Sequence, residues 1–414
     1  MDVSLAVVGA GQRGALYARI AREAGARVVA VAEPDEGART RFADTYGLAP
    51  GMVFDDWRDL LARPKLADAV AICTQDRDHA DPAVAAASLG YHLLLEKPMA
   101  TTPDDAERIV AAIQDAGVIS GVCHVLRFTA YTRALRDLLD AGTIGRIVSL
   151  QHLEPTGWWH FAHSFVRGNW RSEAETSPML LQKCIHDLDW MTFIVGEPVV
   201  RVSSFGTLLE FRPENAPAGA AARCVDCPVR DACPYDAVRI YQGFLADPAA
   251  SHDWPLTVLT PDPDAASVDA ALRTGRYGEC VYAGHNDVVD HQVVSLEFPS
   301  GANAGFTAVA FTEMAGRKTR LFGSRGWIEG DGTLLRVHDF VTDSYRVIDT
   351  ASPGASAADG HGGGDEGLMR AFLAAVEAGD QSLISSDAAT SLASLQVVWA
   401  AERARHAGTV EVLG

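Results

Sequence analysis

The chain has 414 residues and a mass of 44.1 kDa, which is long for one hydrophobic core and predicts two domains. Its formal charge of -19 argues against nucleic acid or an anionic membrane as a partner, because both require a basic surface. No apolar run approaches the roughly 18 residues that a membrane span needs. Met1 leads directly into a strand-like run instead of a signal peptide, so we expect a cytoplasmic protein.

A glycine-rich loop follows the first predicted strand, Ser4 to Val8. Gly9, Gly11 and Gly14 stand between this strand and a helical pattern that runs through Ala24. Strand, glycine loop and helix form an arrangement that binds a pyrophosphate at the helix N-terminus. A second strand, Arg27 to Ala32, ends at Glu33, where an acid would bind a ribose 2′-hydroxyl and repel a 2′-phosphate. We therefore expect NAD in preference to NADP, although the nearby Arg39 leaves NADP open.

Helices and strands continue to alternate up to Cys123, which predicts a doubly wound parallel sheet. The predicted helices cover Glu36 to Tyr46, Asp56 to Leu61, Pro82 to Leu89 and Asp104 to Ala116, and the strands cover Ala69 to Ile72, Tyr91 to Leu95 and Val118 to Val122. Thr74 and His79 follow a strand at its carboxyl end, where they could line the cofactor site; for His79, a capping or surface role is the alternative.

Lys97 ends another buried strand in the segment Leu93-Leu94-Leu95-Glu96-Lys97-Pro98. Ligands of open α/β sheets bind outside the carboxyl ends of the strands, so the amine should project into the cofactor crevice. Pro98 restricts the conformation of the preceding residue, which would hold Lys97 on a stiff backbone. A surface lysine after a core strand is the alternative.

The glycine loop, Glu33 and the Glu96-Lys97-Pro98 segment together resemble the Gfo/Idh/MocA family of glucose-fructose and inositol oxidoreductases, here with a cysteine-rich insertion. The resemblance implies a Rossmann domain followed by an α/β domain with a large, mostly antiparallel sheet, whose open face forms a homodimer or homotetramer. It also implies that Lys97 is the catalytic acid/base. The expected cofactor-binding residues are Gly9, Gly11, Gln12, Arg13, Gly14, Glu33, Thr74, His79, Glu96 and Lys97.

The second half of the chain agrees with this architecture. After a helix over Tyr131 to Ala141, predicted strands without crossover helices indicate antiparallel pairing. They cover Ile147 to Glu154, Val199 to Phe205, Val288 to Phe298, Ala304 to Ala310, Thr319 to Phe322, Leu334 to His338 and Tyr345 to Ile348. A glycine-rich loop over Pro353 to Asp365 precedes closing helices over Glu366 to Glu377 and Asp387 to Arg405. We expect domains over 1–123 and 124–365, an insertion over 212–284, and C-terminal helices over 366–414 that pack back on the core.

A predicted helix over Pro178 to Val195 carries the second group of catalytic candidates. Gln182 and His186 share one face at helical spacing, and Lys183 is adjacent. The resemblance implies an aspartate where Gln182 stands, and glutamine cannot exchange a proton. His186 is a credible proton carrier, and Lys183 could take over part of the electrostatic role. Alternatively, Lys183 pairs with Asp187 while His186 is a core residue.

An aromatic and basic segment lies just before this helix, between Trp158 and Arg171. Aromatic rings suit the C–H face of a sugar, and basic groups suit hydroxyls or an acidic substituent. We therefore expect an anionic sugar, or the cofactor phosphates, to bind here; an aromatic core with solvated arginines is the alternative. The predicted substrate-binding residues are Arg127, His160, His163, Arg167, Trp170, Gln182 and Lys183.

Four of the seven cysteines, Cys224, Cys227, Cys233 and Cys280, have the spacing of a thiolate metal site. Zinc is the expected metal, as a structural clip on an insertion that is short of apolar periodicity; an iron–sulfur cluster or free thiols are the alternatives. The remaining cysteines fall in apolar elements, where burial is expected.

These features predict reversible hydride transfer between NAD and a secondary hydroxyl of a sugar or cyclitol, with Lys97 assisted by His186 and Lys183. A second reading is an NAD-dependent glycoside hydrolase that oxidises an anionic glycoside such as a sulfoquinovoside transiently, eliminates the aglycone, adds water and reduces the product. A regulator that binds the cofactor without turnover is the third reading.

Overall fold

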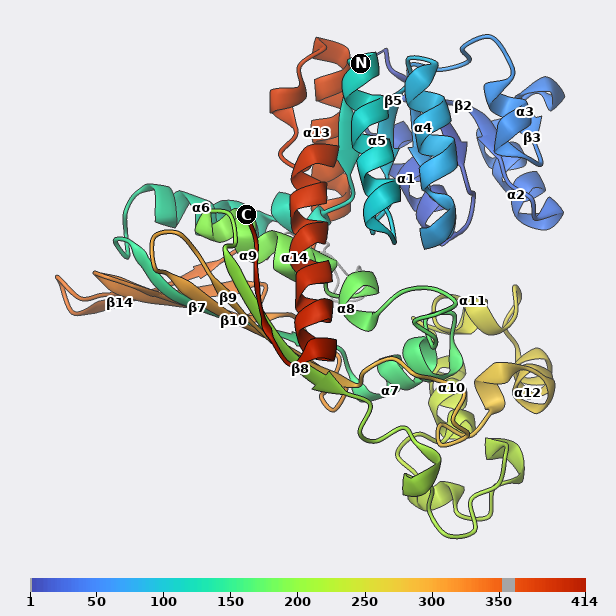
Figure 1. Cartoon of the computed structure of the whole chain (residues 1–414). Helices are drawn as coiled ribbons and strands as arrows, with labels where there is room; N and C mark the ends of the chain where they lie inside the picture. The colour runs from blue at the N-terminus through green and yellow to red at the C-terminus, as the bar shows by residue number, and fades with distance from the viewer. Residues whose placement is uncertain (1, 352–361) are drawn as a thin grey trace.

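The computed structural model describes residues 2–351 and 362–414, which form two sheets joined by helices (Figure 1). Of the predicted glycine-rich loop, residues 353–361 lie outside the described part. The first sheet is parallel, with strand order β3-β2-β1-β4-β5-β6, and confirms the doubly wound prediction. Its strands are β1 (Ser4–Val8), β2 (Arg27–Ala32), β3 (Val53–Phe54), β4 (Ala69–Ile72), β5 (His92–Leu95) and β6 (Ser120–Val122). Its helices are α1 (Gln12–Glu23), α2 (Glu36–Tyr46), α3 (Trp57–Leu61), α4 (Ala80–Ser88) and α5 (Pro103–Ala116).

Local chemistry sets the ends of these elements. Helix α5 begins after Thr102, whose side chain accepts a hydrogen bond from the Asp105 amide, and Pro103 occupies the first turn. It ends at Gly117, whose φ of 63° is left-handed. The strand register brings Val8 opposite Ala32 and Ile72, and Ile72 opposite Leu95. The loops after these four strands therefore meet at one edge of the sheet.

The second sheet has nine strands in the order β14-β13-β12-β11-β7-β10-β9-β8-β15. Its pairs are antiparallel except for β7 and β10, which run parallel. The strands are β7 (Ile147–Pro155), β8 (Arg201–Thr207), β9 (His291–Glu297), β10 (Asn303–Val309), β11 (Lys318–Gly323), β12 (Gly326–Gly330), β13 (Leu334–Asp339), β14 (Ser344–Asp349) and β15 (Val410–Val412). The strands β3, β12 and β15 were not predicted: β3 and β15 have only two and three residues, and β12 begins and ends with glycine.

One face of the second sheet is covered by α6 (Ala130–Asp140), α9 (Ile185–Val195) and α14 (Ala388–Ala407), while no helix of the described residues lies on the other face (Figure 1). Helix α13 (Gly364–Ala378) packs on the first sheet, where Leu368 and Phe372 join the core that contains Val7 and Leu94. The C-terminal segment thus contacts both sheets. None of the described helices combines the length and apolarity needed to cross a membrane.

The predicted helix over Pro178 to Val195 is divided, and this prediction was wrong. Helix α8 (Met179–Gln182) stops before Lys183, and α9 starts at Ile185, with Cys184 outside the helical conformation at φ -103°, ψ 4°. The break leaves the carbonyl of Gln182 free of the helix ladder. That carbonyl accepts a hydrogen bond from Lys97, and the break therefore belongs to the site described below.

The insertion folds as a small helical unit below the first sheet (Figure 1). It contains α10 (Ala237–Ala246), α11 (Leu256–Leu259) and α12 (Ala265–Thr274). Ile240, Tyr241, Leu256, Val268 and Leu272 form a buried cluster of its own. The expectation that this insertion lacks apolar periodicity was therefore wrong: α10 and α12 each bury one apolar face.

Candidate active site

The glycine loop is shaped for close approach at the N-terminus of α1. Gly9 has a φ of 88°, and a Cβ on Gly14 would lie 1.9 Å from the Gly9 carbonyl oxygen, so neither position tolerates a side chain. The Glu33 carboxylate accepts hydrogen bonds from the amides of Ala10 and Asp35 at 2.7 and 2.9 Å. Gly9, Gly11, Glu33 and Thr74 line a cavity of about 650 Å³ at this edge. These residues fit the ribose and pyrophosphate of a dinucleotide.

Two of the predicted cofactor residues are engaged by protein groups instead. Arg13 turns inward and pairs with Glu96 and Asp365, each at 2.5 Å. The Glu96 carboxylate also accepts a hydrogen bond from the Lys97 amide. Burial would raise the pKa of Glu96, but Arg13 and Lys97 outweigh it and hold the pKa below its usual value. Arg13 and Glu96 therefore support the backbone around Lys97, whereas Gln12 reaches Thr257 of the insertion at 3.4 Å.

Lys97 lies at the edge where the cofactor loops meet, and its Nζ donates a hydrogen bond of 2.8 Å to the Gln182 carbonyl. Burial lowers the pKa of Lys97; Glu96 and Asp76 oppose this effect, while Lys183 lowers the pKa further. Burial also raises the pKa of Asp76, and its Oδ2 has no hydrogen-bond partner. Asp76 was missed, although it follows the same strand end as Thr74 and the same argument could have found it.

The histidines near Lys97 are buried. His79 places Nδ1 2.8 Å from the Pro98 carbonyl oxygen and Nε2 3.2 Å from that of Thr74, which ties two loops of the cofactor edge together. The His186 ring lies 6.3 Å from that of His124. His124 bonds to Ser391, and burial lowers its pKa to about 4. His124 was not predicted as a site residue.

A charged network lies on the helix-covered face of the second sheet, beside Lys183. The Lys183 Nζ is 3.3 Å from Glu154 Oε1, so the alternative pairing of Lys183 with Asp187 is not formed. Arg317 pairs with Asp187 at 2.5 Å and lies 3.1 Å from Glu154 Oε2. His152 bonds to Asp187 at 3.0 Å. No local pattern in the sequence marks Glu154, Asp187 or Arg317, since their partners are remote in the chain.

Lys183 and Glu154 line a second cavity of about 410 Å³, together with Thr156, His160 and Arg317. His160 therefore lies where a substrate residue is expected. The Gln182 side chain is buried, and Trp170 packs against Phe165 with ring centroids 6.1 Å apart. Neither lines this cavity.

Three of the predicted substrate residues have buried protein partners. Arg127 forms a bidentate pair with Asp189, both bonds being 2.7 Å. His163 bonds to Tyr241 at 2.8 Å and stacks on Tyr277, inside the insertion. Arg167 donates to the carbonyls of Glu279 and Tyr235 at 2.8 Å each. The aromatic and basic segment thus fastens the insertion to the second sheet, and His160 alone of its predicted residues reaches the cavity.

The four insertion cysteines line one small cavity of about 20 Å³ next to Arg167. Within residues 2–351 and 362–414, however, no three His, Cys, Asp or Glu side chains are grouped so as to hold a metal ion, and all seven cysteines are free thiols. The predicted zinc site is therefore not supported. The insertion has a hydrophobic cluster of its own, which contributes to its packing.

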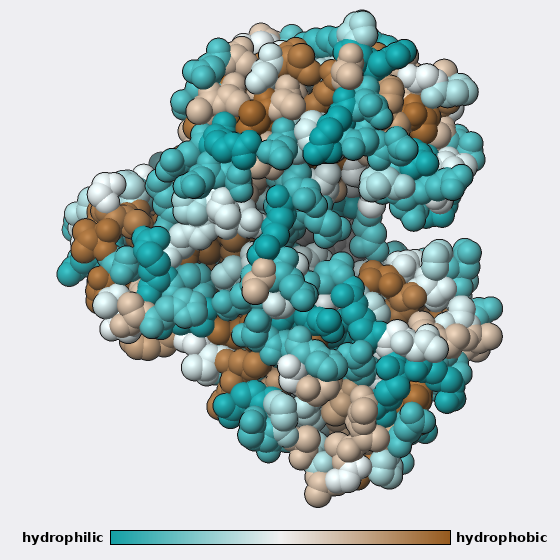
Figure 2. All heavy atoms as spheres, turned by 45° about the vertical axis from the view of Figure 1, so that its right-hand side comes forward, coloured by the Kyte–Doolittle hydropathy of each residue, from teal (hydrophilic) through white to brown (hydrophobic). Residues whose placement is uncertain are grey.

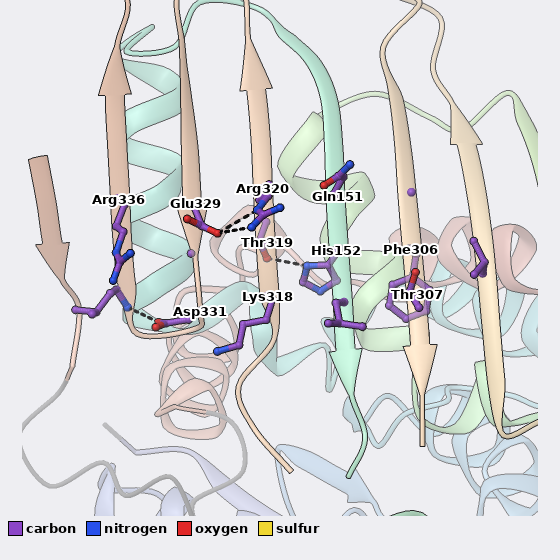
Figure 3. A pocket seen from close by; sticks show the side chains of 15 residues that line it. Gln151, His152, Phe306, Thr307, Lys318, Thr319, Arg320, Glu329, Asp331 and Arg336 are labelled. Atoms are coloured by element: carbon purple, nitrogen blue, oxygen red, sulfur yellow. Dashed lines mark hydrogen bonds and ion pairs between the residues drawn. The ribbon is translucent and has the colours of Figure 1, made fainter. Parts of the chain in front are cut away.

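Another cavity, of about 720 Å³, lies on the open face of the second sheet (Figure 3). Gln151, Lys318, Arg320, Glu329 and Arg336 project from neighbouring strands into it, with Arg320 paired to Glu329. Figure 2 shows a separate notch between the lobe of the first sheet and the insertion lobe. The candidate site lies at the edge of the first sheet, where Lys97 is found, and not in this open-face cavity.

Comparisons with known proteins agree with this geometry. Residues 3–124 match the model of the oxidoreductase family with an NAD-binding Rossmann fold, and residues 132–226 match the GFO/IDH/MocA C-terminal domain. The chain is 32% identical over 197 residues to 2,7-anhydro-N-acetylneuraminate hydratase of Mediterraneibacter gnavus, covering 47% of this chain and 50% of the relative. It is 28% identical to scyllo-inositol 2-dehydrogenase (NAD(+)) of Bacillus subtilis, covering 50% and 58%. The chain spans about half the length of the curated relatives it matches.

A solved structure of levoglucosan dehydrogenase with NADH and levoglucosan has the same fold, with a TM-score of 0.72 and 17% identity over 100% of this chain and 99% of that one. The two family models cover the glycine loop, Lys97 and the helix break in one chain. On this evidence the chain belongs to the Gfo/Idh/MocA family.

Proposed function

We propose that the protein is an NAD-dependent oxidoreductase that acts on a secondary hydroxyl of a sugar or cyclitol. The observation that carries the proposal is Lys97, a half-buried lysine of lowered pKa at the strand edge that the dinucleotide loops share. The names of the relatives support the substrate class, since they include an inositol dehydrogenase and an anhydro-fructose reductase from Ensifer adhaerens that is 30% identical over 178 residues.

The chain's own groups suit proton transfer at the reacting hydroxyl. A lowered pKa lets Lys97 exist as a free amine closer to neutral pH, where it can take the hydroxyl proton. The Gln182 carbonyl and the supported Glu96 backbone hold the amine in position. When bound at the glycine loop, NAD supplies the acceptor for the hydride. His186 is buried near His124, and we propose it as the group that assists Lys97.

The hydrolase reading is kept as the second candidate because two relatives are anhydro-sugar hydratases, including that of Escherichia coli at 29% identity. It uses the same lysine and the same cofactor. p-Nitrophenyl glycosides, neutral and anionic, separate the two reactions when nitrophenolate and NADH are followed together. Aglycone release without lasting NADH indicates the hydrolase, and NADH with free sugars but no aglycone release indicates the dehydrogenase.

The decisive variant is Lys97→Ala, with Lys65→Ala as the matched control on an exposed surface. Loss of a positioned acid/base should lower turnover about 100- to 10,000-fold, while calorimetry should show NAD binding unchanged in both variants. Near-normal turnover of Lys97→Ala would remove the assignment.

We also propose that two or more copies associate through the open face of the second sheet. This face exposes Phe205 and Val293, at 71% and 43%, on the paired strands β8 and β9, and Val347, at 62%, on the edge strand β14; exposed apolar side chains of this kind are more typical of an interface than of a solvated surface. Light scattering should give a mass above that of the 44.1 kDa chain.

A further inference from the structure

We infer that Glu154, Thr156, His160 and Lys183 form a subsite for neutral, hydrogen-bond-donating hydroxyls of the substrate, so that the protein selects a neutral polyol over its acidic counterpart. The inference rests on the proposed function for the substrate class, and it replaces the expected anionic substituent with an uncharged one.

The first observation is the charge balance of the cavity that these residues line. Among the described residues, its cations are Lys183 and Arg317 and its carboxylates are Glu154 and Asp331, because the Lys318 side chain projects from the open face of the sheet. Asp187 adds a third carboxylate through its 2.5 Å pair with Arg317. Lys183 and Arg317 are each paired, at 3.3 Å and 2.5 Å, before any ligand enters. An acidic group would therefore meet no surplus positive charge and would face the Glu154 carboxylate.

The second observation is an unsatisfied hydroxyl. Thr156 is 1% exposed, and its Oγ1 has no hydrogen-bond partner among the described residues, although the side chain lines the cavity. A buried hydroxyl without a partner costs stability, so such a group in a cavity points to a ligand that completes it. Glu154 is 3% exposed, and its Oε2 has an ion pair with Arg317 at 3.1 Å but no hydrogen bond, since Arg317 donates to Asp187.

The third observation is the orientation of His160. Its Nδ1 lies 3.0 Å from the Thr156 carbonyl oxygen, which can only accept, so Nδ1 carries the proton. Burial and the neighbouring Lys183 lower the pKa of His160, which keeps the ring neutral and leaves Nε2 as an acceptor. Glu154 and His160 thus both present acceptors. A sugar hydroxyl can donate to them, whereas a carboxylate or sulfonate cannot.

The test measures binding to the NAD-loaded protein by calorimetry, with myo-inositol and D-glucose as neutral probes and D-glucuronate as the acidic partner of D-glucose. Wild type should bind at least one neutral probe and should bind D-glucose more tightly than D-glucuronate. Glu154→Gln should weaken neutral binding about 10- to 100-fold and reduce the preference over D-glucuronate, because Lys183 loses its partner. Glu107→Gln, on the exposed side of α5, is the matched control and should bind as wild type does.

Thr156→Val keeps the test sound if Glu154→Gln fails to fold. Valine removes only the unpartnered hydroxyl, so the free energy of unfolding should be unchanged or higher, while neutral probes bind more weakly. The inference is overturned by tighter binding of D-glucuronate to wild type, by no binding of either neutral probe, or by wild-type binding in both variants. Failure of the proposed function is a separate result, namely normal turnover of Lys97→Ala with the binding effects of Glu154 and Thr156 intact.

Discussion

Replacing Arg127 by methionine should destabilise the protein without a specific loss of substrate affinity. The Arg127 and Asp189 side chains are only 4% and 1% exposed, and the guanidinium makes two bonds of 2.7 Å to the carboxylate and one of 2.5 Å to the Ser385 carbonyl. Methionine fills much of the space but leaves Asp189 as an uncompensated buried charge. Breaking such a pair costs about 3–5 kcal/mol of the free energy of unfolding. That loss is a large share of the roughly 5–15 kcal/mol typical of folded proteins.

The matched control is Arg136→Met, since the guanidinium groups of Arg127 and Arg136 lie over the same Phe193 ring at 4.7 and 5.6 Å. Arg136 pairs with Asp140 on a helix surface, where an i,i+4 pair contributes about 0.3–0.5 kcal/mol. Urea unfolding followed by tryptophan fluorescence measures both variants. The double variant Arg127→Met/Asp189→Leu should recover part of the loss. Equal stability of the two single variants, with a raised KM only for Arg127→Met, would refute the reasoning. Arg127 would then be assigned as a substrate-binding residue.

Two further predictions concern the active site and the open sheet face. If Lys97 is the base, kcat/KM rises with pH through the pKa of Lys97. Lys183→Gln removes a cation that lowers this pKa and should move the rise to higher pH. Asp76→Asn removes a group that raises the pKa of Lys97 and should move the rise to lower pH. Shifts in the same direction, or none, would contradict this electrostatic account. Phe205→Asp places a charge on the exposed apolar face and should lower the mass found by light scattering toward that of one chain, and an unchanged mass would exclude this face as the contact.

The first sheet could be predicted from the sequence almost residue by residue, because its signals are local. The strands Ser4–Val8, Arg27–Ala32 and Ala69–Ile72 have the predicted bounds. Each is a short apolar run between helix and turn signals. Lys97 could be placed for the same reason, since a strand that ends at Leu95 puts the next residues at the sheet edge.

The break between α8 and α9 could not be predicted in this way. The run from Met179 to Val195 is helical in pattern, and the carbonyl at the break, that of Gln182, has its partner in Lys97, 85 residues earlier. Glu154 was missed for a similar reason: it ends a predicted strand, and nothing nearby in the chain shows that Lys183 and Arg317 will meet it.

The expected preference for an anion rests on composition, which does not say where each charge is compensated. The number of basic residues between Arg127 and His186 suggests a surplus of positive charge. In the folded protein, however, carboxylates pair with several of these cations. Arg127 is neutralised by Asp189, and Lys183 by Glu154. Arg167 is buried among carbonyls that anchor the insertion. The same anchoring explains why His160 is available: Trp254 of the insertion packs edge-on against His160 and His163 at 5.2 and 5.4 Å. The insertion therefore contributes to the proposed subsite by holding His160 in place, with Nε2 of His160 as a hydrogen-bond acceptor.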